Sequence, residues 1–259
     1  MKSAATPPSD LPAGVRLLRY DRIDSTNAEA LRLAHDGEAG PLWLTAGEQT
    51  GGRGRGGRCW ASPPGNLYAS LLLRPRCAAE LAPQLSLLTA VAVHEAIAAV
   101  SAGRIRHPVL TLKWPNDILL DGAKAGGILL ESVSNHGKPG YAVAIGLGLN
   151  LLHHPYDLGR PAAHLGERWP DIEADALLFA IIHGMADWLA RWEDGAGFAR
   201  VRDAWIERSL APGTPISVHA HGSVMRGFFL GIDSGGALRL GSVAPNEPEI
   251  RVTAGDIVF

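Results

Sequence analysis

One stretch of the sequence, GGRGRGGRCW at residues 51–60, carries three arginines among five glycines and no acidic residue. Glycine lets the backbone come close to a ligand, and the planar guanidinium group of arginine donates hydrogen bonds that fit carboxylates and phosphates. The stretch therefore has three interpretations: an arginine-glycine tract that binds RNA, a loop that binds a phosphorylated small molecule, or a solvated turn. It does not match the phosphate-binding pattern GxxxxGK followed by serine or threonine, because Cys59 and Trp60 follow Arg58.

Three further stretches place polar side chains beside glycine or proline. In KWPNDI, residues 113–118, a lysine, an amide and a carboxylate surround a proline, which is typical either of an ordinary turn or of side chains directed into a cleft. In KAGGILLE, residues 124–131, Lys124 precedes bare backbone, so it lies either in solvent or against a ligand. In GLGLN, residues 146–150, Asn150 ends an apolar strand, and a buried amide there bonds either the backbone or a ligand edge.

The composition excludes several classes of protein. The 259 residues carry a formal net charge of −2, so the chain has no general positive field for nucleic acid, and any anion site must be local. Its 46% hydrophobic residues indicate a packed globular core. Two cysteines, Cys59 and Cys77, cannot form a disulfide framework and show no metal-binding spacing. The adjacent His153 and His154 would point to opposite faces of a strand, so we do not expect them to share a metal.

No targeting or membrane segment is predicted. Residues 1–14 contain one lysine and no apolar core, which is typical of a disordered lead rather than a signal peptide. The longest apolar candidates, at residues 141–152 and 176–190, are too short for a bilayer and are interrupted by glycine or polar residues. We therefore expect a cytoplasmic protein with no membrane partner.

Hydrophobic periodicity predicts the elements that must position these stretches. Strands are expected at residues 15–23, 41–49, 66–75, 109–120 and 141–152, and helices at 26–36, 80–100, 171–192 and 198–209. The arginine-glycine stretch lies between two strands, so it is predicted to be a loop of the core. Thr26 and Glu29 match a capping box at the start of the first helix. A hairpin is expected after Pro115, with its returning strand beginning at Gly127.

Beyond residue 211 the pattern changes to short strands separated by glycine and proline turns, which is typical of a small β-barrel. The sequence therefore predicts an α+β fold in three parts. These are a disordered lead at residues 1–14, a mixed β-sheet with helices packed on it at 15–210, and a small β domain at 211–259.

The motifs follow one another in a distinctive order. From about Leu17 to the end, the chain shows STN, GRGRGGRCW, KWPNDI, KAGGILLE and GLGLN, and then a small barrel that contains GIDSGGALRL. In this order the sequence resembles the biotin protein ligases. The resemblance implies a catalytic domain like those of class II aminoacyl-tRNA synthetases and biotin ligases, followed by an SH3-like β-barrel. Lipoate ligases share the fold and an adenylate intermediate, but their arginine and glycine patterns differ from GRGRGGRCW.

The resemblance implies an ATP-dependent ligase. Such enzymes activate biotin with Mg-ATP as biotinyl-5'-AMP and transfer it to a lysine of a biotin carboxyl carrier protein domain, such as that of acetyl-CoA carboxylase. Biotin and ATP are thus the implied substrates and Mg²⁺ the implied cofactor, while monomer and homodimer both remain open. Some members carry a DNA-binding winged helix-turn-helix, for which residues 1–14 are too few, so no repressor function and no nucleic-acid partner is expected.

The resemblance also implies which residues bind the substrates. For biotin these are Ser25, Thr26, Asn27, Gln49, Gly52, Arg53, Lys124 and Gly127. For ATP and the adenylate they are Arg53, Arg55, Arg58, Trp60, Asn116, Gly126, Gly146 and Asn150. Within this set Asn150 would read the adenine edge, and Mg²⁺ would be held through the ATP phosphates with Asn116 as a protein ligand.

Four of the matched positions are implied to take part in catalysis. Lys124 would lie between the biotin carboxylate and the α-phosphate of ATP. Arg55 would retain the adenylate, and Arg58 would face the triphosphate. Asp117 would position or deprotonate the acceptor lysine, although an unperturbed aspartate is a poor base for an ammonium group.

Overall fold

The computed structural model describes residues 10–101, 109–134, 140–155, 161–220, 222–243 and 247–258. The larger of its two sheets has seven strands in the order β1-β2-β3-β7-β6-β5-β4. β1 and β2 pair in parallel, and the other neighbours pair antiparallel. The strands are β1 (Arg16–Ile23), β2 (Leu42–Gln49), β3 (Leu67–Leu73), β4 (Leu110–Lys113), β5 (Asp117–Leu120), β6 (Ala123–Ser134) and β7 (Tyr141–Leu149).

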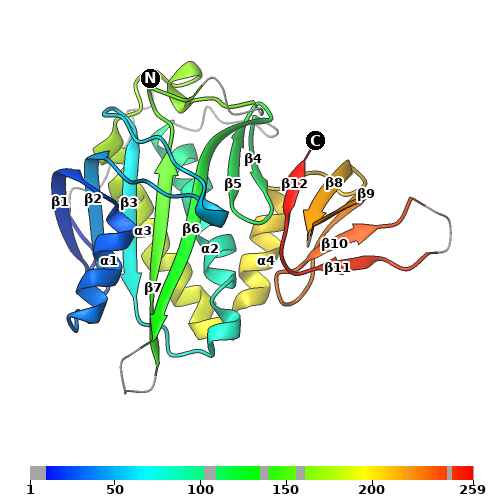
Figure 1. Ribbon diagram of the computed structural model, residues 1–259, viewed down its shortest axis with the longest axis horizontal. Coiled ribbons are helices and arrows are strands. Elements are labelled where there is room, and N and C mark those ends of the chain that lie inside the picture. The colour runs from blue at the N-terminus through cyan, green and yellow to red at the C-terminus, as the bar shows by residue number, and fades with distance from the viewer. Residues whose placement is uncertain are drawn as a thin grey trace.

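Helices cover both faces of this mixed sheet (Figure 1). One face carries α1 (Thr26–His35), and the other carries α2 (Gln84–Val100) and α3 (Ala174–Trp192), with α4 (Phe198–Glu207) beside them. Alternate residues of β2 pack against the helices on opposite faces of the sheet. Leu42 and Leu44 lie in the hydrophobic cluster with Ala30 of α1, whereas Trp43 lies in the cluster that contains the buried residues of α2 and α3. Burial on both sides explains why the central strands are apolar throughout. The predicted α+β architecture is confirmed.

The stretch Ala79–Val100, which includes α2, is the one helix within the described ranges that is long and apolar enough to cross a membrane. However, 61% of the most apolar 18-residue part of this stretch is buried inside the protein. Leu85, Leu88 and Ile97 of α2 have no exposed surface and belong to the main hydrophobic cluster. These are the properties of a core helix.

A second sheet of five short strands follows α4, in the order β11-β10-β9-β8-β12. Its strands are β8 (Pro215–Ala220), β9 (Ser223–Ile232), β10 (Leu238–Gly241), β11 (Ile250–Val252) and β12 (Asp256–Val258). The sheet packs on the first part of the chain, because Phe229 meets Trp205 of α4 at a ring-centroid distance of 6.4 Å and Trp114 Nε1 donates to the Gly236 carbonyl at 3.0 Å. The last two strands lie at opposite edges of this sheet, because β11 pairs with β10 and β12 pairs with β8.

Three local predictions differ from the structure. The strand predicted at residues 109–120 is two antiparallel strands, β4 and β5, which are joined by a turn at residues 114–116. The cap of α1 is Ser25, whose Oγ accepts from the Ala28 N–H at 3.4 Å, so the capping box assigned to Thr26 and Glu29 is wrong. The returning strand of the hairpin begins at Ala123 and not at Gly127. The cause is a two-residue turn at Asp121 and Gly122, whose φ angles of 49° and 79° are those that an Asp-Gly hairpin turn adopts. Lys124 therefore lies within a paired strand.

Candidate functional site

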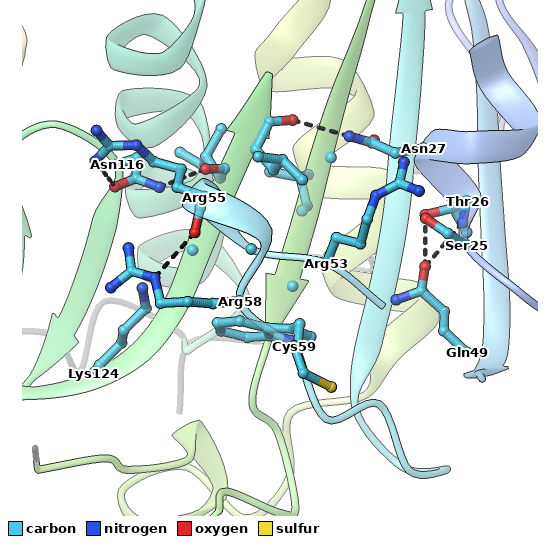
Figure 2. A pocket seen from close by; sticks show the side chains of 18 residues that line it. Ser25, Thr26, Asn27, Gln49, Arg53, Arg55, Arg58, Cys59, Asn116 and Lys124 are labelled. Atoms are coloured by element: carbon cyan, nitrogen blue, oxygen red, sulfur yellow. Dashed lines mark hydrogen bonds between the residues drawn. The ribbon is translucent and has the colours of Figure 1, made fainter. Parts of the chain in front are cut away.

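A cleft lies between the loop at residues 51–60 and the face of β6 and β7 that carries α1 (Figure 2). Most of the site residues implied by the sequence line it, namely Ser25, Thr26, Asn27, Gln49, Arg53, Arg55, Arg58, Trp60, Asn116, Lys124, Gly127 and Gly146. The start of α1, the end of β2, the loop and the two strands each contribute, so residues more than a hundred positions apart meet here. The remaining lining comes from Gly54, Cys59, Ile128, Leu129, Leu147 and Gly148.

The loop itself is a short, tight hairpin. Arg53 and Cys59 form an antiparallel bridge, and the Gly54 N–H donates to the Arg58 carbonyl at 2.7 Å. At the tip, Gly56 and Gly57 have φ angles of 63° and 73°, a left-handed conformation that favours glycine. The glycines thus let the chain reverse direction while Arg55 and Arg58 extend from either side of the tip.

One end of the cleft carries a group of uncharged polar side chains, Ser25, Thr26 and Gln49 (Figure 2). Gln49 Oε1 accepts from the backbone N–H of Thr26 at 2.9 Å and from its hydroxyl at 3.1 Å, and Gln49 Nε2 donates to Ser62 Oγ at 3.0 Å. Ser70 Oγ lies 2.7 Å from both Thr26 Oγ1 and Asn27 Oδ1. Thr26, Asn27, Ser62 and Ser70 are buried and Gln49 is half-buried, and all are mutually bonded, so their positions are fixed before any ligand arrives.

Arg55, Arg58 and Lys124 lie at the other end of the cleft, whereas Arg53 lies beside Asn27, near the uncharged polar groups (Figure 2). Each of these four cations pairs with a carboxylate. Arg53 pairs with Glu131 of β6 at 3.0 Å. Arg55 and Arg58 both pair with Asp256 of β12, at 2.8 and 3.1 Å. Arg55 also donates to the Gly255 carbonyl at 3.3 Å and to Asn116 Oδ1 at 3.2 Å. The second sheet therefore reaches into the site and holds the arginine loop. Because Arg58 and Asp256 are 51% and 41% exposed, this attachment is exchangeable, as exposed ion pairs contribute only about 0–1 kcal/mol.

Lys124 belongs to a buried ion cluster beneath the cleft. Its Nζ contacts Asp117 Oδ1, while Lys113 Nζ lies 2.9 Å from Asp117 Oδ2, and all three side chains are at most 13% exposed. Burial opposes ionisation of the Asp117 carboxyl, but the charges of Lys124 and Lys113 outweigh burial and hold its pKa below the ordinary value. A carboxylate with a lowered pKa is a weak base. These contacts favour an electrostatic role for Asp117 over the base role implied by the resemblance.

Trp60 forms the floor of the cleft beside Lys124. Its ring centroid lies 5.5 Å from Lys124 Nζ, and a side chain at Gly148 would overlap the ring, at 2.5 Å from Nε1. The same ring lies 3.4 Å from the position of a Cβ at Gly127. In the part of the chain that the structure describes, Trp60 Nε1 is buried and has no hydrogen-bond partner. Such a donor costs about 1–3 kcal/mol, so it is expected to find its partner in a ligand.

Four of the implied site residues do not line the cleft. Asp117 lies beneath Lys124, as described above. A side chain at Gly52 would meet the Trp60 carbonyl oxygen and Ser62 Oγ, and a side chain at Gly126 would meet the side chain of Leu149. Asn150 is 3% exposed and donates to the Ala163 carbonyl at 3.0 Å, which is the backbone alternative considered for this amide. Ligand contacts for these residues stay predictions.

The sequence interpretation missed three groups of contributors. Glu131 ends the KAGGILLE motif and lies two residues after Leu129, which lines the cleft. Side chains two positions apart on a strand share a face, so this spacing could have indicated that Glu131 also lies near the site. Ser62 and Ser70 support the polar end from ordinary-looking stretches. Asp256 lies about two hundred residues from the loop that it holds, and no local pattern marks it.

The Asp117 cluster leads to a stability prediction. Replacing Asp117 with asparagine is expected to lower the free energy of unfolding at pH 7 by about 3–5 kcal/mol, because two buried lysines lose their counterion. Since the folded carboxyl has a lowered pKa, its contribution is complete above the unfolded pKa of about 3.9 and is lost as the pH falls through the folded value. Urea denaturation of both proteins at pH 7 and pH 3 should show the difference shrinking at pH 3; an equal difference at both would contradict this account.

Comparison with known proteins places this geometry in a family. Residues 20–150, which hold nearly all of the cleft, match the model of the biotin/lipoate A/B protein ligase family. A biotin–[acetyl-CoA-carboxylase] ligase from Paracoccus denitrificans is 42% identical over 226 residues, covering 85% of this chain and 91% of the relative. The chain belongs to the biotin/lipoate A/B protein ligase family.

Other members of the family extend the match. A bifunctional ligase/repressor from Bacillus subtilis is 32% identical over 94% of this chain and 74% of its own length. The biotin protein ligase from Aquifex aeolicus, solved in complex with biotin and ATP, superposes with a TM-score of 0.78 at 25% identity, covering 94% of this chain and 97% of that structure. The resemblance seen in the motifs is confirmed, and it is to the biotin ligases of the family.

Proposed function

We propose that this protein is an ATP-dependent biotin ligase, which makes biotinyl-5'-AMP and transfers the biotin to a lysine of a biotin carboxyl carrier protein domain. The family membership and the relatives' names support this function. The observation that carries it is the separation, within one cleft, of the uncharged groups of Ser25, Thr26 and Gln49 from the cations Arg55, Arg58 and Lys124. Biotin has the same division, with a neutral ureido ring at one end and a carboxylate at the other.

The first chemical step brings a carboxylate up to a polyphosphate. The two anions repel each other, and negative charge accumulates around the α-phosphorus in the transition state. Lys124 lines the cleft on the same side as Arg55 and Arg58 (Figure 2) and is held in a fixed position by Asp117. We assign Lys124 to the stabilisation of this charge, because a cation held in place before reaction needs little reorganisation.

The loop arginines are assigned to the phosphates. Arg55 and Arg58 are presented together on either side of the loop tip, and both already bind an anion, Asp256. A triphosphate carries more charge than one carboxylate and can displace it from an exposed pair. The same loop then covers the adenylate and keeps water away from it. Trp60, whose indole N–H has no partner among the described residues, lies where the adenylate would extend along β7.

Magnesium fits the cleft through one protein oxygen. Asn116 Nδ2 donates to the Ile128 carbonyl at 2.6 Å, which turns Oδ1 toward Arg55 and the phosphate end. Mg²⁺ commonly binds through one or two protein oxygens, the substrate phosphates and water. We propose that Asn116 supplies that oxygen. When bound with ATP, the ion would neutralise phosphate charge.

We further propose that the second sheet forms an SH3-like barrel and that the chain divides near residue 211 into catalytic and C-terminal domains. The five short antiparallel strands and their order support this. Their contribution to the site comes through β12, which supplies Asp256 to the loop and the Ile257 carbonyl to Lys113 at 3.1 Å. The C-terminal domain would thus set the resting position of the loop.

Biotin-dependent exchange of labelled pyrophosphate into ATP tests the first step. Exchange is expected with biotin and Mg²⁺, and not with lipoate in place of biotin. Transfer is then tested with a purified carrier domain, and a carrier whose acceptor lysine is replaced by arginine serves as the control. Exchange with lipoate but not with biotin would overturn the proposed function.

A further inference from the structure

A cluster of two histidines and a glutamate lies on the segment that follows β7. His154 follows the last residue of that strand, Leu149, by five positions, whereas His164 directly precedes the short 3₁₀ turn Leu165–Glu167 and Glu167 ends it. One ligand-type atom from each of the three side chains lies within 4.8 Å of the other two. Residues 156–160, between the two halves of the cluster, lie outside the described residues, and none of them is part of it.

The distances in this cluster suit a tetrahedral metal ion. His154 Nδ1 lies 3.4 Å from Glu167 Oε1, and His164 Nε2 lies 3.8 Å from the same oxygen. Ligands that bind zinc at 2.0–2.1 Å in a tetrahedron are about 3.3–3.4 Å apart. The three atoms therefore need to move by only a fraction of an ångström to about an ångström to share one ion. Two histidines and one glutamate, with a fourth position open to water, form a common zinc ligand set.

A neighbouring hydrogen bond prepares His164 for this role. His164 Nδ1 lies 3.0 Å from the Leu151 carbonyl, so the tautomer that carries its proton on Nδ1 donates a hydrogen bond there. In the neutral ring Nε2 then presents a lone pair to the Glu167 carboxylate, and two acceptors face each other. A metal cation between them would bind both groups, and the His164 backbone N–H, which donates to Glu167 Oε1 at 2.9 Å, holds the carboxylate beside the ring. Backbone hydrogen bonds to metal-binding histidines commonly fix the tautomer in this way.

We propose that His154, His164 and Glu167 bind one divalent transition-metal ion of the zinc class. The ion would join the segment after β7 to the 3₁₀ turn. These two segments already surround Asn150, because the Leu165 N–H donates to the Asn150 carbonyl at 2.8 Å and Asn150 Nδ2 donates to Ala163. The ion would therefore stabilise the end of the cleft at which β7 finishes. This site is separate from the cleft lining and does not depend on the proposed ligase activity.

Metal titration of the full-length, tag-free protein tests this site in the absence of nucleotide. Calorimetry with Zn²⁺ is expected to show one ion per chain and a rise in melting temperature on binding. The variants His154→Gln, His164→Gln and Glu167→Gln are each expected to weaken binding at least about tenfold, the scale seen when a metal's surroundings are impaired. His153→Gln is the matched control and should bind as the wild type does, because His153 is the adjacent histidine outside the cluster.

A spectroscopic measurement guards against loss of folding in the variants. Co²⁺ bound to the wild-type protein should give the visible bands of a tetrahedral nitrogen and oxygen site, without the intense near-ultraviolet band of thiolate ligands. The Cys59→Ser/Cys77→Ser variant should leave binding unchanged. Wild-type affinity in Glu167→Gln, loss of binding in the cysteine variant, or no bound ion in the wild type would each overturn the proposal.

Discussion

Replacing Lys124 with methionine is expected to lower biotin-dependent pyrophosphate exchange by about 10²- to 10³-fold, the usual cost of removing one fixed electrostatic group from a transition state. Methionine keeps much of the side-chain length, so the cleft beside Trp60 stays filled while the charge is lost. The loss should fall on kcat more than on the KM for biotin, since the charge it stabilises is largest in the transition state. Steady-state exchange over a range of biotin concentrations measures both.

Lys113→Met is the matched control for this result. Lys113 and Lys124 neutralise the same carboxylate, and each is nearly buried, so both substitutions disturb the cluster around Asp117 to a similar degree. Only Lys124 lines the cleft. Lys113→Met should therefore retain exchange within about tenfold of the wild type, a change of ~1.4 kcal/mol. If both variants lose exchange equally, the effect comes from the buried cluster, and Lys124 has no special part in the chemistry.

Replacing Arg55 with alanine is expected to release biotinyl-5'-AMP about 10 to 100 times faster. A hydrogen bond to a charged group contributes about 1.5–3 kcal/mol, and each 1.4 kcal/mol corresponds to a factor of ten. Arg55 is also 30% exposed in its present contacts, so it can turn from Asp256 to a ligand without unfolding the loop. The rate is measured by forming labelled adenylate on the enzyme and chasing it with unlabelled substrates.

Escaped adenylate provides an independent readout for Arg55→Ala. Free biotinyl-5'-AMP acylates lysines without selection, so an added bystander protein should become biotinylated, and a streptavidin blot would detect it. Arg168→Ala is the control, because Arg168 forms a similar exposed ion pair with Asp121 away from the cleft. Wild-type retention of the adenylate in Arg55→Ala would remove Arg55 from the role proposed for it.

The sequence was sufficient to predict the main elements because their patterns are local. The strands on either side of the arginine loop, β2 and β3, are rich in apolar residues, and the loop's own glycines mark its turn. Prediction failed at the start of α1, where Ser25 and Thr26 both have hydroxyls that can cap a helix. Which of the two hydroxyls caps the helix depends on Gln49 at the end of β2, because Gln49 accepts the hydrogen bond of the Thr26 hydroxyl.

The partners of the site were harder to predict than its ligand-facing residues. Motif order indicated Arg55, Arg58 and Lys124, but not the carboxylates that hold them. Asp256 meets the loop only because β12 returns across the second sheet to pair with β8. The bare positions in β6 and β7 were read as room for a ligand, whereas Gly146 makes room for the side chain of Asn27 and Gly148 for the ring of Trp60. Such contacts follow from tertiary packing, which no single stretch of sequence records.

The pairing of every cleft arginine with a carboxylate has a consequence for how substrates arrive. Arg53, Arg55 and Arg58 do not present bare charge to solvent, since Glu131 and Asp256 already balance it. An anionic substrate would then bind by displacement, in which its phosphate replaces a carboxylate as the partner of an arginine. The number of ion pairs that the arginines form would change little. Long-range attraction of ATP should accordingly be weak, and its association rate should depend only slightly on salt. Selectivity would rest on the higher charge of the triphosphate, which a singly charged metabolite cannot match.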